Sequence, residues 1–111
     1  MPLIERSSVT PIEMLPDVHR RTLTDGDRMM LCEVTLEEGA VVPMHTHPHE
    51  QTGYLVSGRM RLQIEDEARD LSPGDSWMIP GGVPHEAAAL GRATIIDVFS
   101  PPRDEYRLIL P

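Results

Sequence analysis

Turn-forming residues recur in this sequence at short intervals, and this close spacing of predicted turns constrains the fold more than any other feature. The 111-residue chain has 11 prolines and 8 glycines, which are spread along its length and do not gather in one low-complexity block. No segment between them shows a sustained helical period bounded by capping residues. Short segments between regular turns predict an all-β fold, a sandwich or a barrel. The turns are predicted at Asp25-Gly26, Glu37–Gly39, Ser57-Gly58, Ser72–Asp75 and Pro80–Gly82.

The segments between these turns carry strand patterns. Residues 59–65 alternate between apolar and polar side chains, so one face of that strand is expected to meet the core. Pro43 lies within a predicted strand and indicates an edge position or a bulge there. Strands are predicted over residues 18–23, 29–36, 40–47, 51–57, 59–65, 76–79, 83–89 and 93–99.

The chain length predicts one domain with a modest core. We expect an N-terminal arm over residues 1–17, a β-barrel over residues 18–100 and a C-terminal tail over residues 101–111. The proline-containing arm could lie along a sheet edge. The tail could form a helical turn, or could pack its apolar Leu108-Ile109-Leu110 segment on a neighbouring chain.

The acidic charge balance makes nucleic-acid and anionic-membrane binding unfavourable. The formal net charge is −8 and no basic block is present, so nucleic acids and anionic membranes are poor partners. No stretch reaches the length needed to span a membrane, and the first ten residues do not resemble a leader peptide. Cys32 is the single cysteine, so no internal disulfide can form, and it is expected to pack as a small apolar side chain. We therefore expect a cytoplasmic protein.

Three histidines lie close together in the middle of the chain, at His45, His47 and His49. Residues two apart in an extended strand project from the same face, so His45 and His47 can bind one metal ion together. Imidazole suits zinc, nickel, iron or copper, and can join oxygen ligands around manganese. The alternative interpretation is a polar, solvated loop, and this stretch alone does not decide between the two.

A second stretch favours the metal site. The first motif, Gly39-x5-His45-x-His47-x3-Gln51-x6-Gly58, resembles the first cupin motif, with glutamine where glutamate is usual. The second motif, Gly74-x5-Pro80-Gly81-Gly82-Val-Pro-His85, resembles the second cupin motif, and its last position, usually asparagine, is Ala89. Residues 59–73 separate the two motifs, as in the most compact cupins. The resemblance covers residues 18–99.

The resemblance to cupins implies a jelly-roll β-barrel. It also implies that one divalent metal ion (zinc, nickel, manganese or iron) is held by His45, His47, Gln51 and His85. The position of Gln51 in the motif favours it as the ligand, with His49 and then Glu50 as alternatives, because Pro48 can reset the strand alternation. Neutral ligands would leave the metal its full positive charge, which suits Lewis-acid chemistry. Without a metal, His85 would be a capping or surface histidine.

The resemblance narrows to one subfamily. The stretch from Pro43 to Gly58, together with Asp97-x-Phe99-Ser-Pro-Pro-Arg103-x-x-Tyr106, is similar to the small KdgF-type cupins. That subfamily acts on unsaturated monouronates released from pectin or alginate, so the resemblance implies an enzyme that opens and ketonises such a sugar acid. It also implies a homodimer. The alternatives are a metal-dependent dioxygenase and a non-catalytic ligand-binding cupin.

Three further residues are candidates for the chemistry. Asp97 shares a strand face with Ile95 and Phe99, and burial there would raise its carboxyl pKa toward the range of a proton carrier. Arg103 could pair with the substrate carboxylate, and Phe99 could stack on the sugar ring. The alternatives are a structural or outward-facing carboxylate at Asp97 and a solvated tail arginine at Arg103.

Overall fold

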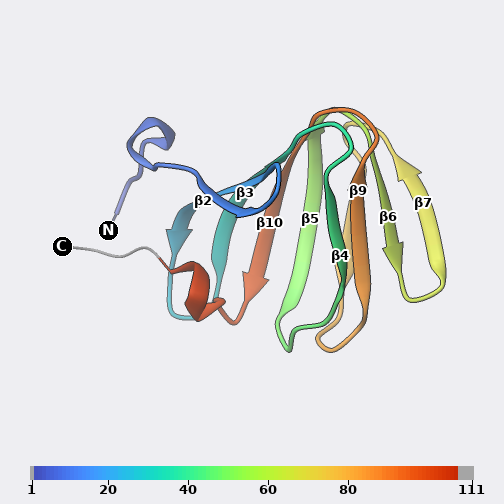
Figure 1. Cartoon of the computed structure of the whole chain (residues 1–111). Coiled ribbons are helices and arrows are strands. Elements are labelled where there is room, and N and C mark those ends of the chain that lie inside the picture. Colours follow the sequence, from blue (N-terminus) through green and yellow to red (C-terminus); the bar gives the residue numbers. More distant parts are fainter. Residues whose placement is uncertain (1, 108–111) are drawn as a thin grey trace.

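The structure, a computed structural model, describes residues 2–107 and is built almost entirely from antiparallel β-strands (Figure 1). Two short 3-10 turns, η1 (Arg6–Ser8) and η2 (Asp104–Tyr106), lie near its ends. This architecture confirms the predicted all-β jelly-roll. The strands are β1 (Ile12–Leu15), β2 (Val18–Asp25), β3 (Met30–Leu36), β4 (Val41–His45), β5 (Glu50–Ser57), β6 (Met60–Ile64), β7 (Glu67–Leu71), β8 (Ser76–Ile79), β9 (His85–Ala89) and β10 (Ala93–Ser100).

The strands form two sheets. One has the order β1-β2-β3-β10-β5-β8 and the other the order β4-β9-β6-β7. In Figure 1, β2, β3 and β10 lie toward the left and β6 and β7 toward the right. The chain crosses repeatedly from one sheet to the other, so strands far apart in sequence become neighbours, as β3 and β10 do. No helix in the described part of the chain is long and apolar enough to cross a membrane.

The core lies between the two sheets and follows the alternation of the strands. On β10 the buried side chains include Ile95, Asp97 and Phe99, which confirms the predicted inward face of that strand. On β6, Met60 and Leu62 are buried and Arg61 is exposed, again as predicted. Cys32 is fully buried, and burial raises the pKa of its thiol to about 11, so it packs as a small apolar side chain.

Trp77 occupies a place that a neighbouring glycine leaves open. It lies on β8 directly opposite Gly53 of β5, and a Cβ added at Gly53 would overlap its indole ring. The ring therefore packs flat against bare backbone and reaches the core cluster of the barrel. A side chain at position 53 would displace it.

The strand that carries the histidine pair is shorter than predicted. We expected a strand over residues 40–47, but β4 ends at His45 and His47 follows it in irregular backbone. Pro43 coincides with a register shift between Val42 and His45, and β4 is an edge strand of its sheet, as the proline predicted. Simple alternation along one strand is therefore not what brings His45 and His47 together.

The two ends of the described chain pack against the larger sheet. Within the predicted arm, β1 pairs with β2 at the edge of that sheet. Within the predicted tail, the η2 turn is held by Thr22, whose hydroxyl donates to the carbonyl of Tyr106 at 2.6 Å. The Leu108-Ile109-Leu110 segment lies outside the described residues, and the division of the chain at residues 17 and 100 stays a prediction.

A cluster of ion pairs connects the segment around Arg6 to β3. The guanidinium of Arg6 donates to both carboxylate oxygens of Glu33, at 2.8–3.0 Å, and Arg21 lies 3.5 Å from the same carboxylate. Arg21 also donates to the carbonyl of Val9 at 3.0 Å. The hydrogen bond from Arg6, the largest cause, lowers the pKa of Glu33, and the charges of Arg6 and Arg21 act in the same direction against the effect of burial.

Replacing Glu33 with glutamine is expected to destabilise the protein at pH 7 but to have little effect in acid. A carboxyl whose pKa is lowered by folding contributes stability above its unfolded pKa and loses it as the pH falls through the folded value. Urea unfolding at pH 7 and at about pH 3 measures this difference. The matched control is Glu67→Gln, which breaks an exposed pair with Arg69 and is expected to be nearly neutral. An equal loss at both pH values would assign the effect to packing instead of charge.

Candidate metal centre

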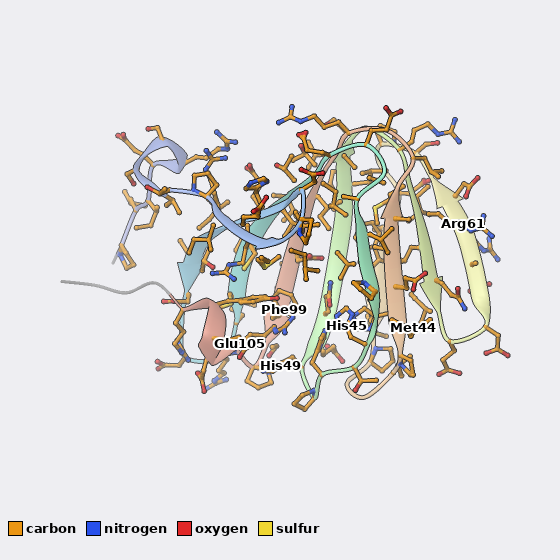
Figure 2. All side chains as sticks on the ribbon, in the orientation of Figure 1. Met44, His45, His49, Arg61, Phe99 and Glu105 are labelled. Atoms are coloured by element: carbon orange, nitrogen blue, oxygen red, sulfur yellow. The ribbon has the colours of Figure 1, made fainter. Side chains whose placement is uncertain are left out.

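Three imidazoles from different elements meet inside one end of the barrel. His45 ends β4, His85 begins β9, and the two residues are register partners across that strand pair. His47 follows β4 and lies with its ring centroid 4.9 Å from that of His85. Nitrogen atoms of all three rings lie within 4.8 Å of one another. Figure 2 shows His45 in the lower part of the molecule, where β4 and β5 lie next to each other in this view.

Backbone carbonyls fix the orientation of each ring. Nδ1 of His45 lies 2.8 Å from the carbonyl oxygen of Pro43, and Nδ1 of His85 lies 2.9 Å from that of Val83. Nδ1 of His47 lies 3.1 Å from the carbonyl oxygen of His49. A carbonyl can only accept a hydrogen bond, so each neutral ring carries its proton on Nδ1 and has a lone pair on Nε2. This is the arrangement in which metal-binding histidines are held.

Gln51 completes the group with an oxygen. It is buried on β5, and its amide nitrogen donates to a carboxylate oxygen of Asp97 at 2.9 Å. That hydrogen bond sets the amide orientation, because the carboxylate accepts, and it turns Oε1 toward Nε2 of His47 at 3.0 Å. Two acceptors therefore face each other at hydrogen-bonding distance.

Burial favours the neutral form of His47 and His85. Burial, the largest cause, lowers the pKa of His47 to about 4, and the charge of Arg103 acts in the same direction. Burial also lowers the pKa of His85, whose Nε2 is buried without a hydrogen-bond partner. Lone pairs that face one another without a proton between them are satisfied by a cation. The residues present therefore fit one divalent metal ion with three imidazole nitrogens and one amide oxygen as ligands.

The two alternatives to Gln51 are placed differently. Among residues 2–107, the donor group within 4.8 Å consists of His45, His47 and His85, and neither His49 nor Glu50 joins it. The Glu50 side chain is exposed at the start of β5. The geometry thus favours Gln51 as the fourth ligand.

Asp97 lies beside this group and is almost fully buried, with 5% of its surface exposed. Burial raises the pKa of its carboxyl to about 6, although the hydrogen bond from Gln51 and the charge of Arg103 act in the opposite direction. A carboxyl with a pKa near neutrality can both hold and release a proton. The inward position that the strand alternation predicted is therefore present.

Phe99 and Arg103 form the wall next to the histidines. The ring of Phe99 meets that of His47 edge to face at 5.8 Å, and the guanidinium carbon of Arg103 lies 5.3 Å from the centroid of Phe99. Arg103 donates through Nε to Glu105 at 2.9 Å, and its side chain is only 15% exposed. It is therefore packed at the site and is not a solvated tail residue.

Two adjoining cavities open onto these residues. The inner cavity, of about 70 Å³, is lined by His45, Gln51, His85, Asp97 and Trp77, among others. The outer cavity, of about 620 Å³, is lined partly by β1 and η2, and it shares His45, Arg103 and Tyr106 with the inner one. In Figure 2, Glu105, which also lines the outer cavity, lies in the lower half of the molecule together with Phe99 and His45.

Comparison with known proteins agrees with this geometry. Residues 32–99, which include both motifs, match the Cupin_2 family, described as the cupin domain. The chain is a cupin. This confirms the resemblance that the two motifs predicted.

Individual relatives of this cupin indicate the subfamily that it resembles. It is 34% identical, over 100 residues, to the pectin degradation protein KdgF of Dickeya dadantii (strain 3937), a match that spans 87% of the chain and 91% of that protein. The structure of KdgF from Halomonas sp. superposes with a TM-score of 0.92 at 32% identity, covering 96% of the chain and 99% of that structure. An RmlC-like cupin from Shewanella frigidimarina gives a TM-score of 0.87 at 26% identity, covering 91% of each chain. This cupin is thus a homologue of KdgF.

The two motifs of this cupin touch directly. The backbone N–H of Gly82 donates to the carbonyl of His47 at 2.8 Å, and Gly81 lies against the carbonyl of Pro48. A Cβ at position 81 would overlap that carbonyl oxygen, so only glycine allows this approach. The contact aligns the loop that carries His47 with the turn that leads into His85.

Replacing Gly81 with alanine is expected to destabilise this cupin by about 1–3 kcal/mol, because the added methyl group must push the two motif loops apart. We expect metal retention to fall as well, since the same contact aligns His47 with His85. Urea unfolding and metal analysis after dialysis measure both effects. The control is Gly91→Ala, where nothing lies within 4 Å of the added Cβ. Equal stability of the two variants would contradict the role given to this contact.

One residue at the site was missed from the sequence. Arg20 is buried and lines the outer cavity. It lies on β2, where Val18 and Thr22 are also buried, so the alternation of that strand places its side chain on the inner face. A polar residue at an inward position of a strand was the available signal.

Proposed function

We propose that this cupin opens and ketonises 4,5-unsaturated monouronates of the kind released from pectin or alginate. The observation that carries the proposal is the contact between a buried carboxyl and the side chains that fit a cation: Asp97 accepts from Gln51, which in turn faces His47. The 34% identity to a pectin degradation protein supports this choice of substrate class.

The reaction is an isomerisation. The ring form of the substrate is a cyclic enol ether that carries a hemiacetal. When the hemiacetal hydroxyl loses its proton, the bond between C1 and the ring oxygen breaks, C1 becomes an aldehyde and the oxygen on C5 becomes an enolate. A proton added at C4 then converts the enolate into a ketone, so the proton released from oxygen balances the proton gained by carbon. No oxidant or reductant is needed.

The ligand set that we propose is His45, His47, Gln51 and His85, holding one divalent ion of zinc, nickel, manganese or iron. Such an ion would supply a positive charge that stabilises an oxygen anion on the substrate. The carbonyls of Pro43, His49 and Val83 orient the three rings for this binding. The amide of Gln51 adds no negative charge of its own.

Asp97 is the proposed proton carrier. Its carboxyl has a pKa of about 6, so at neutral pH a protonated fraction is available for transfer to C4. The amide of Gln51 holds one of its oxygens at 2.9 Å and so fixes the carboxyl in the inner cavity. Phe99 supplies an apolar face for the sugar ring, and Arg103 supplies a charged donor for the substrate carboxylate.

The test is an absorbance assay. The conjugated double bond of the unsaturated uronate absorbs in the ultraviolet, and ketonisation removes it. We expect the purified protein to accelerate the loss of absorbance above the spontaneous rate, and chelation followed by dialysis to abolish that acceleration. Oxygen uptake on the same substrate would indicate a dioxygenase instead, and tight binding without turnover would indicate a non-catalytic ligand-binding cupin. The homodimer and the cytoplasmic location stay predictions.

A further inference from the structure

Arg20 is a buried arginine without an acidic partner. Only 7% of its surface is exposed, and among residues 2–107 no carboxylate lies within 4.0 Å of its guanidinium. Its Nε donates to the hydroxyl of Thr22 at 3.1 Å, and Nη1 lies 3.3 Å from the sulfur of Met14. A buried positive charge without a counter-charge is costly, so such an arginine indicates a site for an anion.

A second arginine lies close to it. The guanidinium carbon of Arg20 lies 4.1 Å from the ring centroid of Tyr106, and that of Arg103 lies 4.2 Å from the same centroid. Cation–π contact with the ring holds both groups in place. It does not neutralise them, so two like charges remain beside one aromatic side chain.

Both arginines line the outer cavity next to His45. The one acidic side chain in that lining is Glu105, and it is already bound by Arg103. The wall therefore keeps an excess positive charge in a protein whose formal net charge is −8. The remaining lining is mainly apolar and comes largely from Ile12, Met14 and Leu15 of β1 and from β4. The cavity volume of about 620 Å³ is within the usual range for small-molecule sites.

We propose that Arg20, together with Arg103, binds the carboxylate of the substrate in the outer cavity and makes the protein selective for sugar acids over neutral sugars. The inference rests on the proposed function for the identity of the sugar, but its physical basis is the uncompensated charge of Arg20. A carboxylate placed between the cavity mouth and Tyr106 would accept charge-assisted hydrogen bonds from the arginines. It would also relieve the repulsion between the two guanidinium groups.

The test compares a sugar acid with its neutral counterpart, using galacturonate and galactose as probes that the protein cannot turn over. Titration calorimetry on the 111-residue protein is expected to show that Arg20→Gln weakens galacturonate binding about tenfold to a hundredfold. Arg20→Lys, which keeps the charge and loses the planar fork, is expected to recover part of the affinity. The control is Arg61→Gln, an identical change on the exposed face of β6, far from His45 in Figure 2.

Further measurements guard against a merely structural effect. The thermal unfolding midpoint of each variant is measured first, and Arg20→Met, which keeps the length of the apolar stem, replaces Arg20→Gln if the latter is unfolded. With wild-type protein, galacturonate is expected to raise the unfolding midpoint more than galactose does. Equal midpoint shifts from the two sugars, or wild-type galacturonate affinity in a folded Arg20 variant, would overturn the proposal.

The outcome is separable from that of the proposed function. Arg20-dependent binding of galacturonate without turnover of the unsaturated uronate would leave this inference standing and remove the proposed reaction. Turnover of the unsaturated uronate with an unchanged kcat/KM in Arg20→Gln would do the reverse, because loss of a substrate-binding contact lowers kcat/KM.

Discussion

Replacing His85 with alanine is expected to lower metal affinity at least 100-fold and to reduce turnover of the unsaturated uronate to the spontaneous rate. Loss of a residue that merely orients a ligand costs 10–100-fold in metal affinity, so loss of a ligand itself should cost more. His85 is also the ring that packs closest to His45, with 4.2 Å between their centroids, and its Nε2 has no other partner. Metal analysis after dialysis, followed by the absorbance assay, measures both effects.

The control for this prediction is His19→Ala. His19 lies on β2 and its side chain is 39% exposed, with Glu13 as its nearest acidic neighbour at 3.6 Å. Its removal is expected to leave metal content and activity unchanged. A His85→Ala protein that keeps its metal and its activity through dialysis would remove the three-imidazole site from the proposed reaction.

Replacing Asp97 with asparagine is expected to lower kcat by about 10²–10⁴-fold while leaving metal content unchanged. The asparagine oxygen can still accept from the amide of Gln51, so the orientation of Gln51 and of its oxygen is preserved. What is lost is the group that holds and transfers a proton. Kinetics with the unsaturated uronate, run beside metal analysis of the same preparation, separate these two outcomes. Wild-type kcat in the asparagine variant would exclude Asp97 as the proton carrier.

Stability of the metal-free protein provides an independent readout of the same carboxyl. Folding raises the pKa of Asp97 from 3.8 to about 6, so its contribution to stability is fully present below the unfolded pKa and is lost as the pH rises through the folded one. The Asp97→Asn variant has no such dependence, because an amide does not titrate in this range. Urea unfolding across these pH values should therefore show that the free energy of unfolding of the variant increases relative to that of the wild type as the pH rises. A flat difference would mean that the carboxyl is not desolvated.

Much of this arrangement could be predicted from local sequence pattern. The turn residues predicted most strand boundaries, although not the end of β4, because glycine and proline limit where extended backbone can continue. The alternation of β10 placed Asp97 and Phe99 on the inner face, because side chains on a strand alternate strictly between faces. The motif spacing indicated the metal ligands through family resemblance, and their convergence depends on the contact between the Gly81-Gly82 turn and the loop after His47.

Other parts could not be predicted, because they arise from packing between distant segments. Arg103 was open to interpretation as a solvated tail residue, and its burial follows from the η2 turn folding back so that Tyr106 lies beside both Phe99 and Arg103. Arg20 gave only a weak signal on its own strand. Its proposed role depends on the cavity that β1 and η2 form beside β2, which no local pattern reveals.

The position of Trp77 has a practical consequence. It is the only tryptophan in the chain, and its indole lines the inner cavity together with Gln51 and Asp97. Because Gly53 leaves the ring against backbone, the fluorophore is shielded from solvent. Its intrinsic emission should therefore respond to events inside the barrel with no background from another indole. The protein thus carries a built-in optical reporter, which makes rapid-mixing measurements of ligand entry possible without a label.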